Sequence, residues 1–185
     1  MFKPQSLPAL ALLVVVAACN DAVSTSSPDF AAASARGTGD NVAVVRMMDA
    51  CDPTTFAGVP GGCQRNGGVT MEQFASQLSR LGRVPAWQFA PTDLFLQEGD
   101  EYMATNFGGE VHTFTEVEEF GGGIVPAFNN ILGLTIAPEC ESLLQSDFIP
   151  PGQSTPADEP EEVGDEHYQC CIHPWMRMTV HVREG

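Results

Sequence analysis

The sequence predicts an all-β sandwich or barrel with one inserted helix and long irregular loops, for three reasons. From Val84 onward, short apolar runs such as VPAWQFA, DLFLQEGD and VHTFTEV are separated by Gly, Pro, Asp and Asn, as is typical of short strands joined by turns. In the last run, MRMTVHV, apolar residues alternate with polar ones at the period of a half-buried strand. Only the stretch VTMEQFASQLSRLG has helical periodicity. Short strands at this spacing form a sandwich or a barrel.

The chain of 185 residues is expected to contain one folded domain, residues 41–185, preceded by two short regions. Residues 1–18 combine the basic Lys3 with an apolar run, which is the pattern of an export signal. The run ends in VAAC, which is similar to a bacterial lipobox, so Cys19 is predicted to be lipidated. An ordinary signal followed by a chance cysteine is the alternative. Residues 19–40 are rich in Ser, Ala and Thr and are predicted to be a flexible tether.

Charge and export limit the functions that we expect. The formal net charge is −16, so nucleic acid is not expected as a partner. The protein is expected to be exported and membrane-anchored through its lipid, facing the periplasm or the cell exterior, where cysteines form disulfides. Of its 6 cysteines, those beyond Cys19 are odd in number, so one is either free or committed to something else. Cys51 and Cys63 bracket a loop rich in Pro and Gly, and we predict a disulfide between them.

The inserted helix is predicted to begin after Thr70, which forms a capping box with Gln73, and to end at Gly82. Its apolar face is expected to contain Met71, Phe74, Ala75, Leu78 and Leu81. Residues 121–160 are irregular and predict long connections with at most one edge strand. The acidic run over residues 158–166 is interpreted as a solvated loop, with a docking surface as the alternative.

The stretch YQCCIHPWM, residues 168–176, contains the side chains with the most distinctive chemistry. On a strand, Cys170 and Cys171 point to opposite faces, so at most one of them reaches the place where His173 and Met176 converge. Choosing Cys170 gives the spacing Cys-x-x-His-x-x-Met, and Cys171 remains the alternative. A thiolate, an imidazole and a thioether suit copper, because thiolate and imidazole hold Cu(II) and soft sulfur favours Cu(I). A zinc site and a metal-free, disulfide-bonded cluster are the competing interpretations.

An electron-transfer copper site of this kind needs a second histidine beside the cysteine and the weak axial methionine. Strand alternation puts His167 on the face opposite Cys170 and puts His181 opposite the apolar residues of the last strand. His112 is the remaining candidate, and the Gly-Gly turn before it allows a close backbone approach. Asn106 and Thr113 are candidates for hydrogen bonds that tie the two ligand segments together.

The segment CCIHPWM resembles the C-terminal ligand loop of the cupredoxins, the type 1 blue copper proteins, and above all the short loop of the amicyanins and plastocyanins. The resemblance covers about residues 84–182 and implies a Greek-key, cupredoxin-like β-sandwich that holds one type 1 copper ion. The ligands that it implies are His112, Cys170, His173 and Met176. If Cys170 binds copper, Cys140 and Cys171 remain to form a second disulfide.

The resemblance also implies a function: an exported carrier of single electrons between redox partners, not an enzyme and without a small-molecule substrate. In the family the loop histidine reaches the surface through an apolar patch, so His173 is expected to be the electron port. The acidic residues near His112, which are Glu110, Glu116, Glu118 and Glu119, are expected to attract a basic partner such as a basic cytochrome. The competing functions are an envelope protein that binds or delivers copper and a metal-free structural lipoprotein.

Overall fold

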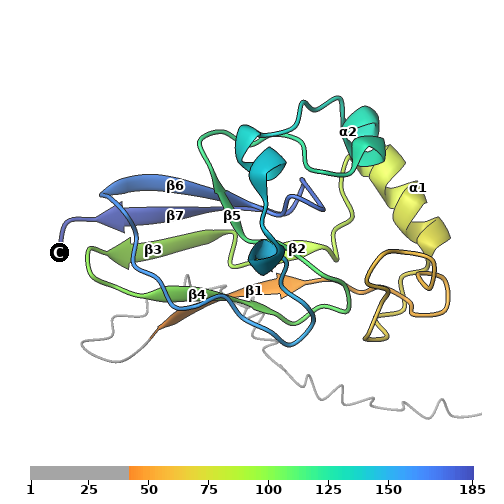
Figure 1. Cartoon of the computed structure of the whole chain (residues 1–185), viewed down its shortest axis with the longest axis horizontal. Coiled ribbons are helices and arrows are strands. Elements are labelled where there is room, and N and C mark those ends of the chain that lie inside the picture. Colours follow the sequence, from red (N-terminus) through yellow and green to blue (C-terminus); the bar gives the residue numbers. More distant parts are fainter. Residues whose placement is uncertain (1–41) are drawn as a thin grey trace, which may run out of the picture. The chain divides into compact units, whose positions relative to one another are not determined.

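A computed structural model describes residues 42–185, which belong to one compact unit. The predicted signal, the tether and Cys19 lie outside the described residues. Within the described part, the strands form two sheets that face each other (Figure 1). The first sheet has the order β2 (Gln88–Ala90), β1 (Ala43–Met48), β4 (Tyr102–Asn106). The second has the order β3 (Asp93–Gln97), β7 (Arg177–Arg183), β6 (Gly164–Gln169), β5 (Thr115–Val117).

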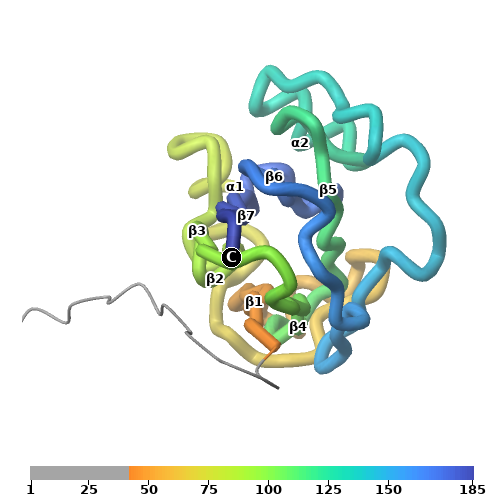
Figure 2. Tube along the Cα trace, turned by 90° about the vertical axis from the view of Figure 1, so that its left-hand side faces the viewer, coloured from red at the N-terminus to blue at the C-terminus, as the bar shows by residue number. Residues whose placement is uncertain are grey.

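Both sheets are mixed, and their pairing brings distant segments together. β1 pairs in parallel with β4 and antiparallel with β2. β7 pairs in parallel with β3 and antiparallel with β6, which in turn pairs antiparallel with β5. Figure 2 views the strands end-on and shows the two layers that they form. The predicted all-β sandwich is therefore confirmed.

Alternating apolar residues place the core between the sheets. In β7, Met178, Val180 and Val182 are buried, as the alternation predicts, and Val45 and Met47 of β1 are buried on the facing sheet. These side chains belong to one continuous core cluster. Burying a large aliphatic side chain contributes about 1.5–3 kcal/mol, so this shared core holds the two sheets together.

The predicted helix is α1 (Met71–Leu81), and both its ends follow from local sequence. The Thr70 hydroxyl accepts a hydrogen bond from the Gln73 backbone, the Gln73 side chain accepts one from the Thr70 backbone, and Gly82 closes the helix at φ 65°. Phe74 and Leu78 are buried as predicted. The prediction is wrong for Ala75, which is exposed, and for Leu81, which is 57% exposed and lies outside the core cluster.

A second helix, α2 (Pro126–Leu132), lies in the segment that was predicted to be irregular. Its seven residues, PAFNNIL, are too few to show an amphipathic period, although Pro126 and Gly133 mark its start and stop. Two 3-10 turns follow, η1 (Pro138–Ser142) and η2 (Gln145–Asp147), and isolated bridges replace the expected edge strand. None of the helices among the described residues is long and apolar enough to cross a membrane.

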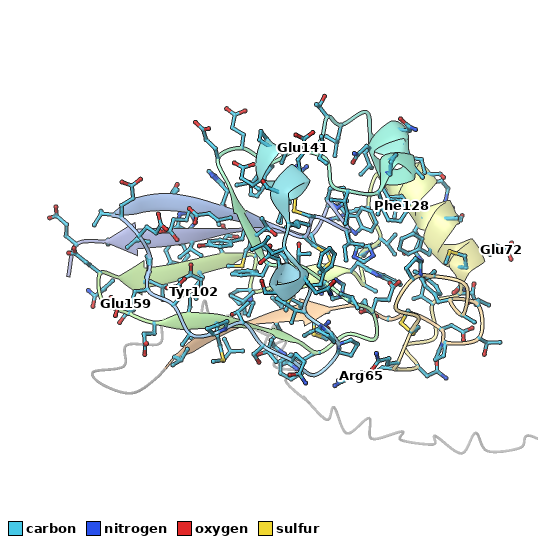
Figure 3. The ribbon with its side chains drawn as sticks, viewed as in Figure 1. Arg65, Glu72, Tyr102, Phe128, Glu141 and Glu159 are labelled. Atoms are coloured by element: carbon cyan, nitrogen blue, oxygen red, sulfur yellow. A yellow bond between two sulfur atoms is a disulfide. The ribbon has the colours of Figure 1, made fainter. Side chains whose placement is uncertain are left out.

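The inserted segments gather at one end of the sandwich. α1 and α2 lie side by side there, beyond the ends of β2 and β5 (Figure 1). Phe128 projects from α2 into the space beside α1 (Figure 3), where its ring is 5.7 Å from that of Phe74. The two disulfides in the described residues reinforce these segments: Cys51–Cys63 closes the loop before α1, and Cys140–Cys171 ties η1 to the segment after β6.

Candidate metal centre

Three buried groups that can ligate a metal meet at the end of the sandwich that α1 and α2 cover. The Cys170 Sγ atom is 3.8 Å from Nδ1 of His112 and 3.8 Å from Nδ1 of His173. One ligand atom from each of these residues lies within 4.8 Å of the others. Both imidazoles therefore direct Nδ1 toward the same thiol, which leaves their Nε2 atoms for other partners.

Each group comes from a different local structure. His112 follows the turn after β4 and is held by a two-way backbone pairing with Ile149. Cys170 follows the last residue of β6. The chain then turns back on itself, because the Met176 N–H donates to the His173 carbonyl and the Cys170 N–H donates to the Met176 carbonyl. This closed loop keeps Cys170, His173 and the fully buried Met176 in one small volume.

The structure separates the roles of the two adjacent cysteines. Cys171 is bonded to Cys140, whereas Cys170 is the free cysteine of the described residues. The pairing of Cys51 with Cys63 and of Cys140 with Cys171 is the one that the sequence led us to expect. Cys170 is therefore the only thiol in this part of the chain that is left for a metal.

Thr113 links the two ligand segments directly. Its backbone N–H donates to Cys170 Sγ at 3.4 Å, and its hydroxyl accepts the backbone N–H of Cys171 at 2.7 Å. Asn106 holds the segment before His112, since its amide donates to the carbonyl oxygens of Glu110 and Ile149. The expected link between the two ligand segments is therefore confirmed for Thr113, whereas it is wrong for Asn106, whose side chain bonds to Gly108, Glu110 and Ile149 and not to the loop of Cys170.

The electrostatics of the cluster favour a thiolate. Burial alone would raise the pKa of the Cys170 thiol, but hydrogen bonds with His112 and His173 and the charge of those imidazoles lower it well below its usual value. A thiolate with two imidazole nitrogens directed at it is a donor set that matches copper or zinc. Met176 is fully buried in the same loop, and a thioether ligand there would favour copper.

The prediction that His173 reaches the surface is wrong. The residue is only 3% exposed, because inserted segments cover the face on which the port was expected. The rings that surround the imidazole at centroid distances of 5.5–6.5 Å are Phe74, Trp87, Phe128 and Trp175. Trp175 itself packs against Phe128 of α2, with the two ring centroids 5.4 Å apart.

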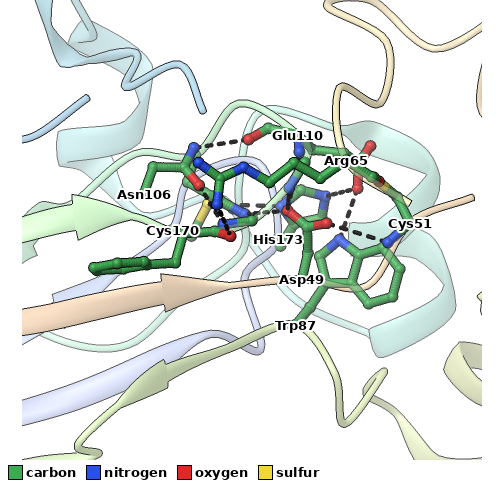
Figure 4. Close-up of polar contacts among 12 residues, drawn as sticks. Asp49, Cys51, Arg65, Trp87, Asn106, Glu110, Cys170 and His173 are labelled. Atoms are coloured by element: carbon green, nitrogen blue, oxygen red, sulfur yellow. Dashed lines mark hydrogen bonds and ion pairs between the residues drawn. The ribbon is translucent and has the colours of Figure 1, made fainter. Parts of the chain in front are cut away.

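Glu110 was also expected at the surface, and this prediction is wrong as well. It is 5% exposed, and its Oε2 atom accepts the indole N–H of Trp87 at 2.7 Å and lies 3.7 Å from Nε2 of His173. Burial raises the pKa of Glu110, although the charge of His173 and the hydrogen bond from Trp87 act in the opposite direction. A carboxyl group is therefore enclosed beside the loop histidine (Figure 4).

Sequence reasoning missed Asp49, which contacts the other histidine. The Asp49 side chain is completely buried, and its Oδ2 atom is 2.9 Å from Nε2 of His112. Burial would raise the pKa of Asp49, but hydrogen bonds from His112 and from the backbone N–H groups of Glu110 and Gly109 lower it to about 2. Asp49 directly follows β1, far from His112 in sequence, and no local pattern distinguishes it from other acidic residues at strand ends.

Comparison with known proteins gives similarity to solved structures only. No protein-family model and no curated protein matches the chain. The purple cupredoxin from Nitrosopumilus maritimus is 16% identical, with a TM-score of 0.43, over 76% of this chain and 99% of its own. An oxidised amicyanin mutant is 15% identical, with a TM-score of 0.40, over 78% and 85%. A reduced Cu(I) amicyanin mutant is 16% identical, with a TM-score of 0.37, over 78% and 85%. These solved structures are cupredoxins, the family that the C-terminal segment resembles.

Proposed function

We propose that the protein is a type 1 copper protein that carries single electrons between redox partners. The observation that supports this most directly is the convergence of Nδ1 of His112, Nδ1 of His173 and Sγ of Cys170 in a fully buried volume. Two imidazoles and one thiolate are the donor set of a blue copper site, and the thioether of Met176 would be a further, weak ligand. Copper bound there would supply one-electron chemistry through its Cu(II) and Cu(I) states.

The chain's own residues would keep this donor set in one geometry. The hydrogen bonds of Thr113 to both cysteines and the closed loop from Cys170 to Met176 leave the ligands little freedom to move. Burial excludes water, so no coordination position is open to a substrate. A preorganised, dry site changes little between oxidation states, which favours electron transfer over catalysis.

The same burial favours a carrier over a copper-delivery protein. Delivery requires an incoming thiol or imidazole to reach the metal, and all the proposed ligands are at least 97% buried. An electron needs no such access, because it can leave through the packed aromatic groups. Phe128 and Trp175 contact His173 and are themselves half-buried, so we propose the surface over these two rings as the exit in place of the histidine edge.

The proposed partner remains a basic redox protein such as a cytochrome. An open groove of about 490 Å³ has an acidic lining that includes Glu116, Glu118, Glu139, Glu161, Glu162 and Asp165. This charge would attract a basic protein, and the association rate would fall as ionic strength rises. We also retain the proposal that the chain is exported and anchored through a lipid on Cys19.

Copper titration of the purified protein tests the proposed function. Adding Cu(II) to the wild type should produce one intense visible thiolate-to-copper band at one equivalent, and Cys170→Ser should abolish the band. His173→Ala should weaken or shift it, whereas the matched control His181→Ala should leave it unchanged, because His181 lies on β7 among the acidic groups of Asp93 and Asp165. A wild-type protein that stays colourless, or that keeps the band without Cys170, contradicts the proposal.

A further inference from the structure

We propose that Asp49 is a positioning residue for the metal centre: it holds His112 with Nδ1 toward the metal, and its buried negative charge lowers the reduction potential. The inference rests on the proposed function, because it concerns the same site. It adds a residue from outside the ligand segments, 63 positions away in sequence from the histidine that it holds.

The contacts of Asp49 match a hydrogen-bond acceptor at both carboxylate oxygens. Oδ2 accepts the backbone N–H groups of Gly109 at 2.8 Å and Glu110 at 2.9 Å, and it contacts Nε2 of His112 at 2.9 Å. Oδ1 accepts the backbone N–H of Cys51 at 3.2 Å. Every partner is a nitrogen that can donate a hydrogen bond, so both oxygens of Asp49 are placed as the acceptors of an ionised carboxylate.

This arrangement determines which nitrogen of His112 can bind a metal. A hydrogen bond to Asp49 requires the proton on Nε2, and the lone pair is then on Nδ1, which is the atom 3.8 Å from Cys170 Sγ. Carboxylates commonly orient metal-binding histidines in this way from the second ring nitrogen. Glu110 lies beside Nε2 of His173 in a similar place, but at 3.7 Å the contact is longer than a hydrogen bond.

The backbone around Asp49 is shaped to admit it. A Cβ atom on Gly108 would lie 2.0 Å from Asp49 Oδ2, and one on Gly109 would lie 2.6 Å from Cys51 Sγ. Glycine at both positions therefore lets the turn before His112 close onto the carboxylate. The disulfide between Cys51 and Cys63 anchors the residue whose N–H binds Oδ1. The loop before α1 contains none of the proposed metal ligands, but through Cys51 it helps to hold Asp49 and therefore His112.

A buried negative charge beside a ligand stabilises the higher charge of oxidised copper relative to reduced copper. Asp49 is sheltered from water, so this interaction is screened far less than one at the surface. Removing the charge should favour the reduced state by at least tenfold, which for one electron equals a rise of about 59 mV in potential.

The experiment compares Asp49→Asn with Asp93→Asn in the copper-loaded, full-length protein, by redox titration of the visible band. Both variants remove one negative charge, but the Asp93 side chain is 59% exposed and lies on β3 beside His181. In Asp49→Asn we expect the reduction potential to rise by at least about 59 mV, which corresponds to a tenfold shift toward the reduced state. In Asp93→Asn we expect the potential to differ from wild type by no more than a twofold shift would produce. Equal potentials in Asp49→Asn and wild type would overturn the inference while leaving the copper site intact.

A measurement on the wild type keeps the inference testable if Asp49→Asn does not fold. In the diamagnetic Cu(I) protein, nitrogen-15 NMR should show a proton on Nε2 of His112 that is protected from solvent exchange. A proton on Nδ1, with Nε2 bound to the metal, would refute the role of Asp49. Failure of the wild type to bind copper would instead refute the proposed function, so the two failures are distinguishable.

Discussion

Replacing Phe74 with alanine should destabilise the fold and also open the metal centre. The ring of Phe74 is the hub of the aromatic cluster under α1 and α2, with centroids of its neighbours at 4.9–6.5 Å. Those neighbours are Phe56, Trp87, Phe128, His173 and Trp175. Because Phe74 is buried, its removal leaves a cavity among rings that other elements hold in place.

The size of the effect follows from burial. A buried Phe→Ala change typically costs about 3–5 kcal/mol, through lost transfer free energy and the cavity that remains. The matched control is Leu81→Ala on the same helix, since Leu81 is mostly exposed and lies outside the core cluster. Its effect should stay within about 0.5 kcal/mol, as is usual for surface substitutions.

The assay is urea unfolding of the metal-free protein, followed by circular dichroism for both variants and the wild type. A loss of at least about 3 kcal/mol in the free energy of unfolding is expected for Phe74→Ala only. In the copper-loaded protein, electron exchange with a small inorganic oxidant should also become several-fold faster, because His173 loses part of its cover. Equal stabilities of Phe74→Ala and Leu81→Ala would show that α1 does not hold the aromatic cluster together.

Three further predictions concern groups that are not themselves proposed ligands. Replacing Cys140 and Cys171 together by serine should lower the free energy of unfolding by about 3–4 kcal/mol, because the unfolded chain loses a closed loop; urea midpoints unchanged by reductant would contradict this. Thr113→Val should cost about 1–3 kcal/mol in the same assay, because it leaves the N–H of Cys171 without its acceptor. Asp165 raises the pKa of His181, so His181 stabilises the fold at low pH, and this contribution should disappear as pH rises through the raised pKa. His181→Gln should therefore flatten that part of the profile of stability against pH, and an unaltered profile would refute the pairing.

Local sequence patterns were sufficient for the strands, for α1 and for the spacing of the loop ligands. The alternation in β7 and the capping box at Thr70 depend only on neighbouring residues, and both occur as predicted. The Cys-x-x-His-x-x-Met spacing is equally local. Strand alternation showed that only one of Cys170 and Cys171 can face the cluster and left His112 as the candidate among the histidines, whereas the choice of Cys170 came from the resemblance to the cupredoxin loop.

Long-range packing decided what surrounds those ligands. α2 is too short to have a recognisable period, yet it and α1 cover His173, which would otherwise lie at the surface. The inward positions of Asp49 and Glu110 depend on which backbone N–H groups and rings lie beside them in the folded chain. A sequence indicates that an acidic residue prefers water, but it does not reveal buried donors far along the chain that replace that water. The sequence thus determined the fold class and the donor set, whereas tertiary structure determined the burial, orientation and charge of the site.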